Sequence, residues 1–130
     1  MIIVKHKSDL LNTERAVETD DYSTVRLLLK KDGAGLTVTD VMIKGQSDSI
    51  YGYKHHKEIC YCLEGEATLV DLENGIEHTI KPGSLWAATN HEKFRFIAHK
   101  PTRLISIFDP ALVGPETNDE EGSFPLLSDG

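Results

Sequence analysis

The residues best suited to chemistry in this chain of 130 residues are two histidines and a glutamate in its middle and later parts. His56 and Glu58 are two positions apart in a strand-like run, so both side chains can face the same side of a sheet. His91 lies in a later turn that the expected fold brings near them. Imidazole nitrogens and a carboxylate suit iron, zinc or manganese, so the pattern predicts a metal site of His56, Glu58 and His91. The alternative is that His91 is exposed and that His56 only marks the entrance of a strand.

Three side chains could also bind a small polar molecule or act on it chemically without a metal. Glu58 in an apolar cavity would have a raised pKa and could act as a general acid or base. Tyr53 could donate a hydrogen bond to a reacting oxygen, and the planar fork of Arg26 could bind a carboxylate through two hydrogen bonds. Structural roles compete with each: a glutamate hydrogen-bonded inside the fold, a core or interface tyrosine, and an arginine in a surface or interstrand ion pair.

Strand-like segments must position these residues, and they account for most of the chain before its tail. Enrichment in β-branched and aromatic residues with partial alternation marks residues 25–29, 36–43, 58–63, 66–72, 94–98 and 103–108. Turn residues lie between them at 31–33, 73–75, 81–83 and 99–102. About eight strands with short connections predict an all-β fold, a single antiparallel barrel of jelly-roll type that is closed or nearly closed.

The two ends of the chain lack this pattern. Residues 8–11 predict a short N-terminal helix that the following polar residues end early. The tail 109–130 holds prolines, glycines and an acidic cluster, so we expect it to be irregular. Its apolar stretch 124–127 should pack back on the barrel, either as a lid over the mouth or as a seal of an apolar end.

Composition bounds the class of protein. A chain of 130 residues, 39% of them hydrophobic, predicts one domain over residues 1–130. The net charge of −7 argues against a nucleic-acid partner and leaves a small molecule as the expected ligand. No leader pattern or membrane-length apolar run is present, so the expected location is the cytoplasm, with no membrane partner. Cys60 and Cys62, two apart on a strand, cannot form an unstrained disulfide and are expected to be reduced core residues.

The spacing of several central residues is typical of cupin motifs. Histidines stand shortly before a glutamate, and a glycine follows, as His55, His56, Glu58 and Gly65 do here. The second cupin motif has a histidine three residues after the glycine of a Pro-Gly pair, and that position holds Trp86. The chain therefore resembles the cupin superfamily in outline while lacking part of its usual histidine set.

Longer matches run almost from end to end. They comprise Arg-Leu-Leu-Leu at 26–29, Tyr-Lys at 53–54, Tyr-Cys-Leu-Glu-Gly-Glu at 61–66, Pro-Gly at 82–83, Phe-Asp-Pro at 108–110 and Asp-Glu-Glu-Gly-Ser-Phe-Pro-Leu-Leu at 119–127. In order and spacing these segments resemble ectoine synthase, an enzyme of the cupin superfamily. The resemblance implies a cyclodehydratase, in which the α-amine of N-γ-acetyl-2,4-diaminobutyrate attacks its own acetamide carbonyl and water is lost to give the cyclic amidine ectoine.

The resemblance also implies a ferrous ion held by a glutamate, a tyrosine and a histidine. Glu58 matches the glutamate. The tyrosine position is Trp86, whose indole nitrogen has no lone pair to offer a metal, and the histidine position is Phe94. Two of the three implied ligands are therefore replaced by aromatic side chains, which either reduce the cavity and end catalysis or form a wall that recognises a cationic or planar molecule.

For the substrate, the resemblance implies a pocket that this chain keeps in part. The matching or substituted positions are Tyr22 in place of a tryptophan, Ser106 in place of a cysteine, Asn118 in place of a histidine, and the unchanged Arg26, Tyr53, Phe108 and Glu116. We therefore predict substrate binding by Tyr22, Arg26, Trp86, Phe108 and Glu116, with Glu58 and Tyr53 in catalysis.

Three functions remain open at this level. The first is ectoine synthase activity itself. The second is a cupin that binds a small molecule without catalysis, and the third is an enzyme acting on another acylated amino acid. The resemblance also implies a head-to-tail homodimer joined through strands.

Overall fold

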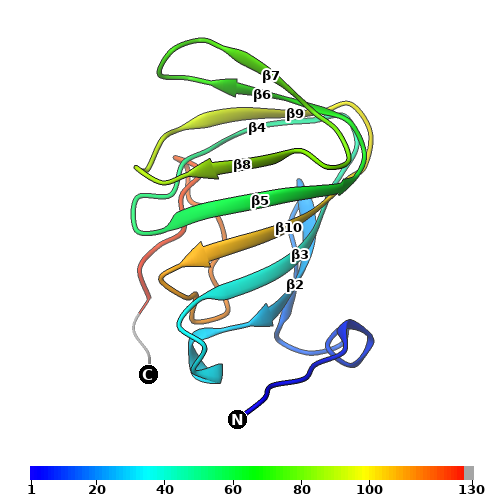
Figure 1. Cartoon of the computed structure of the whole chain (residues 1–130), viewed down its shortest axis with the longest axis vertical. Helices are drawn as coiled ribbons and strands as arrows, with labels where there is room; N and C mark the ends of the chain where they lie inside the picture. The colour runs from blue at the N-terminus through cyan, green and yellow to red at the C-terminus, as the bar shows by residue number, and fades with distance from the viewer. Residues whose placement is uncertain (128–130) are drawn as a thin grey trace.

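The computed structural model describes residues 1–127 and consists of two antiparallel β-sheets that share one core (Figure 1). The six-stranded sheet has the order β1 (Ala16–Glu18), β2 (Tyr22–Leu28), β3 (Thr37–Ile43), β10 (Thr102–Asp109), β5 (Lys57–Glu64) and β8 (Leu85–Ala88). The four-stranded sheet has the order β4 (Ser47–Tyr51), β9 (Phe94–Ala98), β6 (Ala67–Asp71) and β7 (Glu77–Ile80). Two single 3₁₀ turns, η1 (Lys7–Asp9) and η2 (Lys30–Asp32), complete the regular structure of the described residues.

Period-two alternation sets the faces of the long central strands. In β5, Glu58, Cys60 and Cys62 are buried, while Ile59 and Tyr61 are exposed. The neighbouring β10 alternates in the same way. Because successive side chains of a strand point to opposite faces, this pattern directs one row of each strand into the space between the sheets.

One row of side chains crosses five strands of the six-stranded sheet. The register pairs Arg26 of β2 with Thr39 of β3, Thr39 with Ser106 of β10, Ser106 with Cys60 of β5, and Cys60 with Trp86 of β8. Paired residues of adjacent strands project to the same face, so these five side chains form a continuous line across the inner face. This row becomes the polar floor of the site described below.

Tight connections carry the chain from one sheet to the other. At Gly65, between β5 and β6, φ is +108°, and a Cβ atom would lie 2.4 Å from Thr102 Oγ1 and 2.5 Å from Thr102 Cα. Only glycine tolerates this combination of positive φ and close approach. The cupin-type glycine thus serves the passage between sheets.

The structure confirms the all-β, cupin-like fold and corrects its details. The sheets do not close into a barrel; they remain two sheets in all described residues. The turn predicted at 99–102 does not join paired strands, because β9 lies in the four-stranded sheet and β10 in the six-stranded sheet. The predicted N-terminal helix is only the 3₁₀ turn η1, whose N-cap His6 makes no side-chain capping bond. Without a capped first turn, a helix this short does not propagate.

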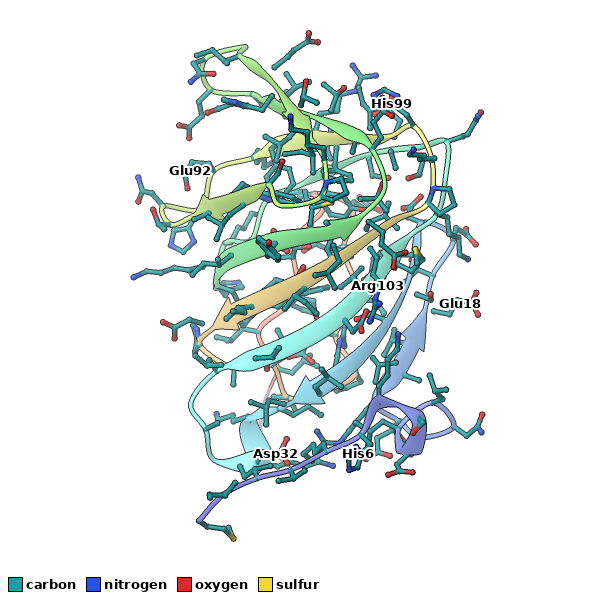
Figure 2. All side chains as sticks on the ribbon, turned by 45° about the vertical axis from the view of Figure 1, so that its right-hand side comes forward. His6, Glu18, Asp32, Glu92, His99 and Arg103 are labelled. Carbon is teal, nitrogen blue, oxygen red and sulfur yellow. The ribbon has the colours of Figure 1, made fainter. Side chains whose placement is uncertain are left out.

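Ion pairs attach the N-terminal segment and reinforce the outer face of the six-stranded sheet. Asp32 accepts hydrogen bonds from Arg15 Nη1 and Nη2 at 2.8 and 3.0 Å and from Lys5 Nζ at 3.1 Å. These partners, the Arg15 guanidinium first among them, lower the pKa of Asp32. Arg103 of β10 donates to Asp40 of β3, from Nε at 3.1 Å and from Nη2 at 2.7 Å. Figure 2 shows Asp32 beside the N-terminal segment and Arg103 on the sheet above it.

The helical structure of residues 1–127 consists of two 3₁₀ turns of three residues each, and neither could span a membrane.

Candidate functional site

A cavity of about 50 Å³ lies between the two sheets. Its wall is mainly aromatic and aliphatic, formed by Tyr22, Val41, Ile43, Tyr51, Tyr53, Trp86, Phe94, Phe96, Leu104, Phe108 and Phe124. Its polar members are Thr24, Arg26, Thr39, Glu58, Cys60 and Ser106. A single water needs roughly 10–15 Å³ on this measure, so the cavity has room for several waters or a compact ligand. An apolar cavity with a few convergent polar groups is the usual form of a small-molecule site.

Glu58 is the acidic group of this cavity. It is buried on β5, and among the described residues its Oε1 has no hydrogen-bond partner. Desolvation raises the pKa of Glu58 to about 8, and the neighbouring Cys60 thiol lowers it by a smaller amount. The carboxyl group is therefore largely protonated at neutral pH, and it can donate a proton as well as accept one.

Cys60 and Ser106 hydrogen-bond to each other beside Glu58. Cys60 Sγ and Ser106 Oγ are 3.1 Å apart across β5 and β10. Burial raises the pKa of the Cys60 thiol well above its usual range, so it is not a reactive thiolate. Cys60 and Cys62 are both buried thiols, which confirms that they are core residues, and their reduced state stays a prediction.

Arg26 is oriented differently from the prediction of a free carboxylate clamp. Its side chain is 1% exposed, and both ends of its guanidinium fork donate to the C-terminal tail. Nη1 donates to the carbonyl of Gly114, and Nη2 donates to the carbonyl of Glu116 at 2.6 Å. Nor is Arg26 in the predicted alternative, a surface or interstrand ion pair. It fastens the tail over the cavity, and Nε is the guanidinium nitrogen that has no partner in the described residues.

The predicted residues Tyr22 and Tyr53 meet through an amide of the tail. Tyr22 donates its hydroxyl proton to Asn118 Oδ1 at 2.8 Å. Asn118 Nδ2 donates to the Tyr53 hydroxyl at 3.3 Å and to the carbonyl of Gly122 at 3.1 Å. Because the Tyr53 oxygen accepts from Asn118, its own hydrogen can be directed to an occupant of the cavity. Desolvation raises the pKa of Tyr53, so it remains a neutral donor.

The tail covers one side of the cavity through Phe124. This ring lies 4.8 Å from the Tyr53 ring and 5.2 Å from the Phe108 ring, and the Arg26 guanidinium carbon lies 5.3 Å from its centroid. Phe124 is 3% exposed. The stretch 124–127 therefore packs back on the sheets through Phe124, whereas Leu126 remains 69% exposed, and whether the stretch opens as a lid stays a prediction.

Glu116, predicted to bind substrate, lies outside the cavity wall. Its carboxylate oxygens accept hydrogen bonds from the backbone N–H groups of Val113 and Gly114, each at 2.7 Å. With both oxygens engaged, the side chain shapes the turn whose carbonyls Arg26 holds. Glu116 therefore positions the tail rather than facing the cavity.

The structure does not bring the predicted metal set together. His56 is buried but faces a separate pocket of about 200 Å³, with Nδ1 2.8 Å from the carbonyl of Pro110, whereas Glu58 faces the main cavity. His91 is exposed, and its Nδ1 lies 2.8 Å from the carbonyl of Tyr53. Within residues 1–127, no three His, Cys, Asp or Glu side chains gather closely enough to hold a metal. The separation arises because His56 precedes β5, where strict alternation no longer applies.

The iron set implied by resemblance does not fit either. Glu58, Trp86 and Phe94 do line one cavity, so the fold keeps these three positions together. Only Glu58 has an atom that can bind a metal. Trp86 and Phe94 lie in mutual edge-to-face contact with ring centroids 6.4 Å apart, filling the space with aromatic surface. We therefore derive no reaction step through a metal.

Several residues of the site carried no clear sequence signal. Asn118 links two tyrosines that are far from it in sequence, and only the family comparison drew attention to its position. Thr24 reads as an ordinary strand residue. Phe124 had a signal, since it begins the apolar stretch in an otherwise polar tail.

The fold defines a cupin-like protein. A solved RmlC-like cupin from Shewanella frigidimarina superposes with a TM-score of 0.60 at 18% identity, covering 72% of this chain and 79% of that one. At such identity the likeness concerns the fold alone.

Sequence and structure together then define the family. The ectoine synthase family profile matches residues 1–128. The L-ectoine synthase of Oceanobacillus iheyensis is 35% identical over 128 residues, covering 98% of this chain and 100% of the relative. The crystal structure of ectoine synthase from P. lautus matches with a TM-score of 0.82 at 35% identity, covering 85% of this chain and 80% of that one. The chain belongs to the ectoine synthase family.

Proposed function

We propose that this protein is a cyclodehydratase of ectoine synthase type that closes the ring of N-γ-acetyl-2,4-diaminobutyrate. The observation that carries the proposal is the position of Glu58. The family's glutamate stands in the wall of an aromatic cavity, with one carboxyl oxygen unpaired among the described residues. Full-length matches to proteins named L-ectoine synthase support the same reaction.

Glu58 and Tyr53 are assigned the acid and donor roles. The α-amine nitrogen attacks the acetamide carbon, and Glu58 gives a proton to the carbonyl oxygen while Tyr53 donates a hydrogen bond to it. The nitrogen then returns a proton to Glu58, and a second protonation of the oxygen releases it as water while the C=N bond forms. The closed aromatic wall favours this loss of water and holds the substrate curled for attack.

The test is direct product formation. Purified protein is incubated with N-γ-acetyl-2,4-diaminobutyrate, and the cyclic amidine is followed by chromatography. We expect product from the wild type, and Glu58→Gln should lower kcat at least about a hundredfold, the usual minimum for loss of a general acid. Glu64→Gln, at the exposed end of the same strand, is the matched control and should remain active. Equal rates for both variants would refute the role of Glu58.

A binding function without turnover is the second candidate. Trp86 and Phe94 at two ligand positions favour it, because they replace catalytic surface by aromatic wall. Saturable binding of the acylated amino acid without product would support this reading. Turnover of a different acylated amino acid would instead identify the third function.

Removal of metal provides a further prediction. Since only Glu58 of the implied set can ligate, we expect that treatment with a chelator leaves the rate of ring closure unchanged and that the purified protein holds far less than one metal per chain. Metal content and activity are measured on the same sample. Activity lost to the chelator and restored by ferrous iron would show that other residues supply the ligands.

A homodimer is the proposed assembly. Large apolar side chains are exposed on the outer face of the six-stranded sheet, with Ile59 at 37%, Tyr61 at 44% and Leu85 at 63%. Exposed patches of this kind commonly mark protein interfaces. Light scattering should give the mass of two 14.5 kDa chains, and Leu85→Glu should reduce it to one. Leu72→Glu, at another exposed apolar position, should leave the dimer intact.

The cytoplasm is the proposed location. The free, buried state of both cysteines supports a reducing compartment.

A further inference from the structure

The cavity concentrates the unpaired polar groups of the protein. In residues 1–127, five buried side-chain polar atoms have no hydrogen-bond partner, and four of them belong to residues that line this one cavity. The four are Thr24 Oγ1, Arg26 Nε, Glu58 Oε1 and Trp86 Nε1. A buried polar group that lacks a hydrogen-bond partner destabilises the folded protein. Their concentration in a single cavity indicates that the missing partners come from an occupant.

Two of these atoms fix the chemistry of that occupant. Trp86 Nε1–H and Arg26 Nε–H can only donate hydrogen bonds. A cationic group would leave both unpaired, so the cavity selects hydrogen-bond acceptors. The ring of Trp86 is also engaged, with the Phe96 centroid 5.4 Å away at an interplanar angle of 32°. Its polar edge, rather than its ring face, therefore serves recognition.

The two donors lie at opposite ends of the cross-strand row. Arg26 on β2 begins the row and Trp86 on β8 ends it, with β3, β10 and β5 between them. Four strand spacings of about 4.8 Å separate their backbones, so one oxygen atom cannot serve both. A suitable ligand carries two acceptor groups, one at each end.

We propose that Trp86 is a substrate-binding residue whose indole N–H donates a hydrogen bond to the acyl carbonyl oxygen of an N-acylated amino acid, while the ligand's carboxylate lies toward Arg26. The guanidinium charge places the carboxylate at the Arg26 end. The acyl carbonyl then lies at the Trp86 end, where Glu58 stands two residues from Cys60, the cross-strand neighbour of Trp86. The choice of ligand rests on the proposed function, whereas the donor role of Trp86 rests on the geometry.

A single spectroscopic signal tests this proposal. Trp86 is the only tryptophan of the chain, so a ¹H–¹⁵N spectrum contains one indole N–H resonance. The full-length protein is titrated with N-γ-acetyl-2,4-diaminobutyrate and, in parallel, with 2,4-diaminobutyrate, which lacks the acyl carbonyl. We expect the acylated compound alone to move the indole proton downfield, as a new hydrogen bond requires. The Glu58→Gln variant provides a form in which ring closure does not interfere.

Calorimetric affinities give the second measurement. Trp86→Phe keeps an aromatic ring but removes the donor, and it should weaken binding of the acylated compound about tenfold. Thr79→Val removes a polar group from the exposed strand β7 and should leave affinity unchanged. Because the spectrum is recorded without altering Trp86, poor folding of the Phe variant would not prevent a decision.

The outcomes separate this inference from the proposed function. If the backbone amides of Cys60 and Ser106 shift with the acylated compound while the indole resonance stays fixed, Trp86 is not the donor. An equal indole shift with both compounds would also refute binding of the acyl carbonyl. An indole shift without product formation would leave the inference standing and refute the synthase function. No shift of any cavity resonance with either compound would refute both.

Discussion

Replacing Glu58 with glutamine is expected to stabilise the protein by several kcal/mol at pH 9 and to have little effect at pH 4. Burial raises the pKa of Glu58 from 4.5 to about 8 in the folded state. The unfolded chain releases this proton from about pH 4.5 upward, whereas the folded protein retains it until about pH 8. Stability is therefore full below pH 4.5 and falls as pH rises toward 8, with an upper limit of about 5 kcal/mol for this group.

The measurement is urea unfolding of wild type and variant at several pH values. The difference in unfolding free energy between the two proteins should grow between pH 4.5 and 8 and then level off. Glu64→Gln, exposed on the same strand, should show no such growth. A difference for Glu58→Gln that is constant with pH would mean that the carboxyl is not desolvated. If the difference in unfolding free energy grows with pH, Glu58→Gln is a stably folded protein. A loss of its activity is then due to the missing carboxyl group and not to unfolding.

The long central strands were predictable because they are rich in β-branched, aromatic and other apolar residues. Residues 58–63 and 103–108 have this composition, and both lie in observed strands. Strand β4 (Ser47–Tyr51) lacked such a signal because it is mostly polar, and β8 (Leu85–Ala88) because it is short and contains no β-branched residue. Assignment of strands to sheets was not predictable, since a short turn looks the same whether it joins paired strands or crosses between sheets.

The sequence predicted which residues line the cavity better than it predicted what each of them does there. Tyr53, Glu58 and Phe108 were expected in the pocket and do line the cavity. The role of Arg26 depended on carbonyls about ninety residues away, since the bonds to Gly114 and Glu116 span 88 and 90 positions. No local pattern encodes such a contact. Glu116 accepts hydrogen bonds from amides only two and three residues away, but the turn that they form is irregular and has no sequence pattern that predicts this role.

Two substitutions relative to the family fit each other physically. Tyr22 and Asn118 stand where the resemblance implies a tryptophan and a histidine, and here they hydrogen-bond to one another at 2.8 Å. A phenol hydroxyl and an amide oxygen form a neutral pair that is independent of pH in the physiological range. The same amide also reaches Tyr53. The contact between tail and cavity is therefore rebuilt with different chemistry, which argues that closure of the cavity still matters to this protein.

Replacing Arg26 with methionine is expected to detach the tail from the sheet and lower stability by about 3–5 kcal/mol. The change removes two hydrogen bonds from a charged donor and leaves the carbonyls of Gly114 and Glu116 buried without it. It also removes the cation beside the Phe124 ring. Hydrogen exchange is the measurement. Tail amides such as those of Leu112 and Ser123, both hydrogen-bonded in the structure, should exchange much faster, while sheet amides change less.

The control for this prediction is Arg103→Met, because Arg103 also bridges to another residue, Asp40, but on the outer face of the same sheet. It should lower stability without selectively exposing the tail. Arg26→Lys keeps the charge but lacks the planar fork that reaches both carbonyls. The tail amides of this variant should therefore exchange at an intermediate rate. If tail amides in Arg26→Met exchange as slowly as in the wild type, the tail is held by Phe124 packing and Asn118 alone. Faster exchange would show that the Arg26 guanidinium, which also lines the cavity, holds the tail closed over it.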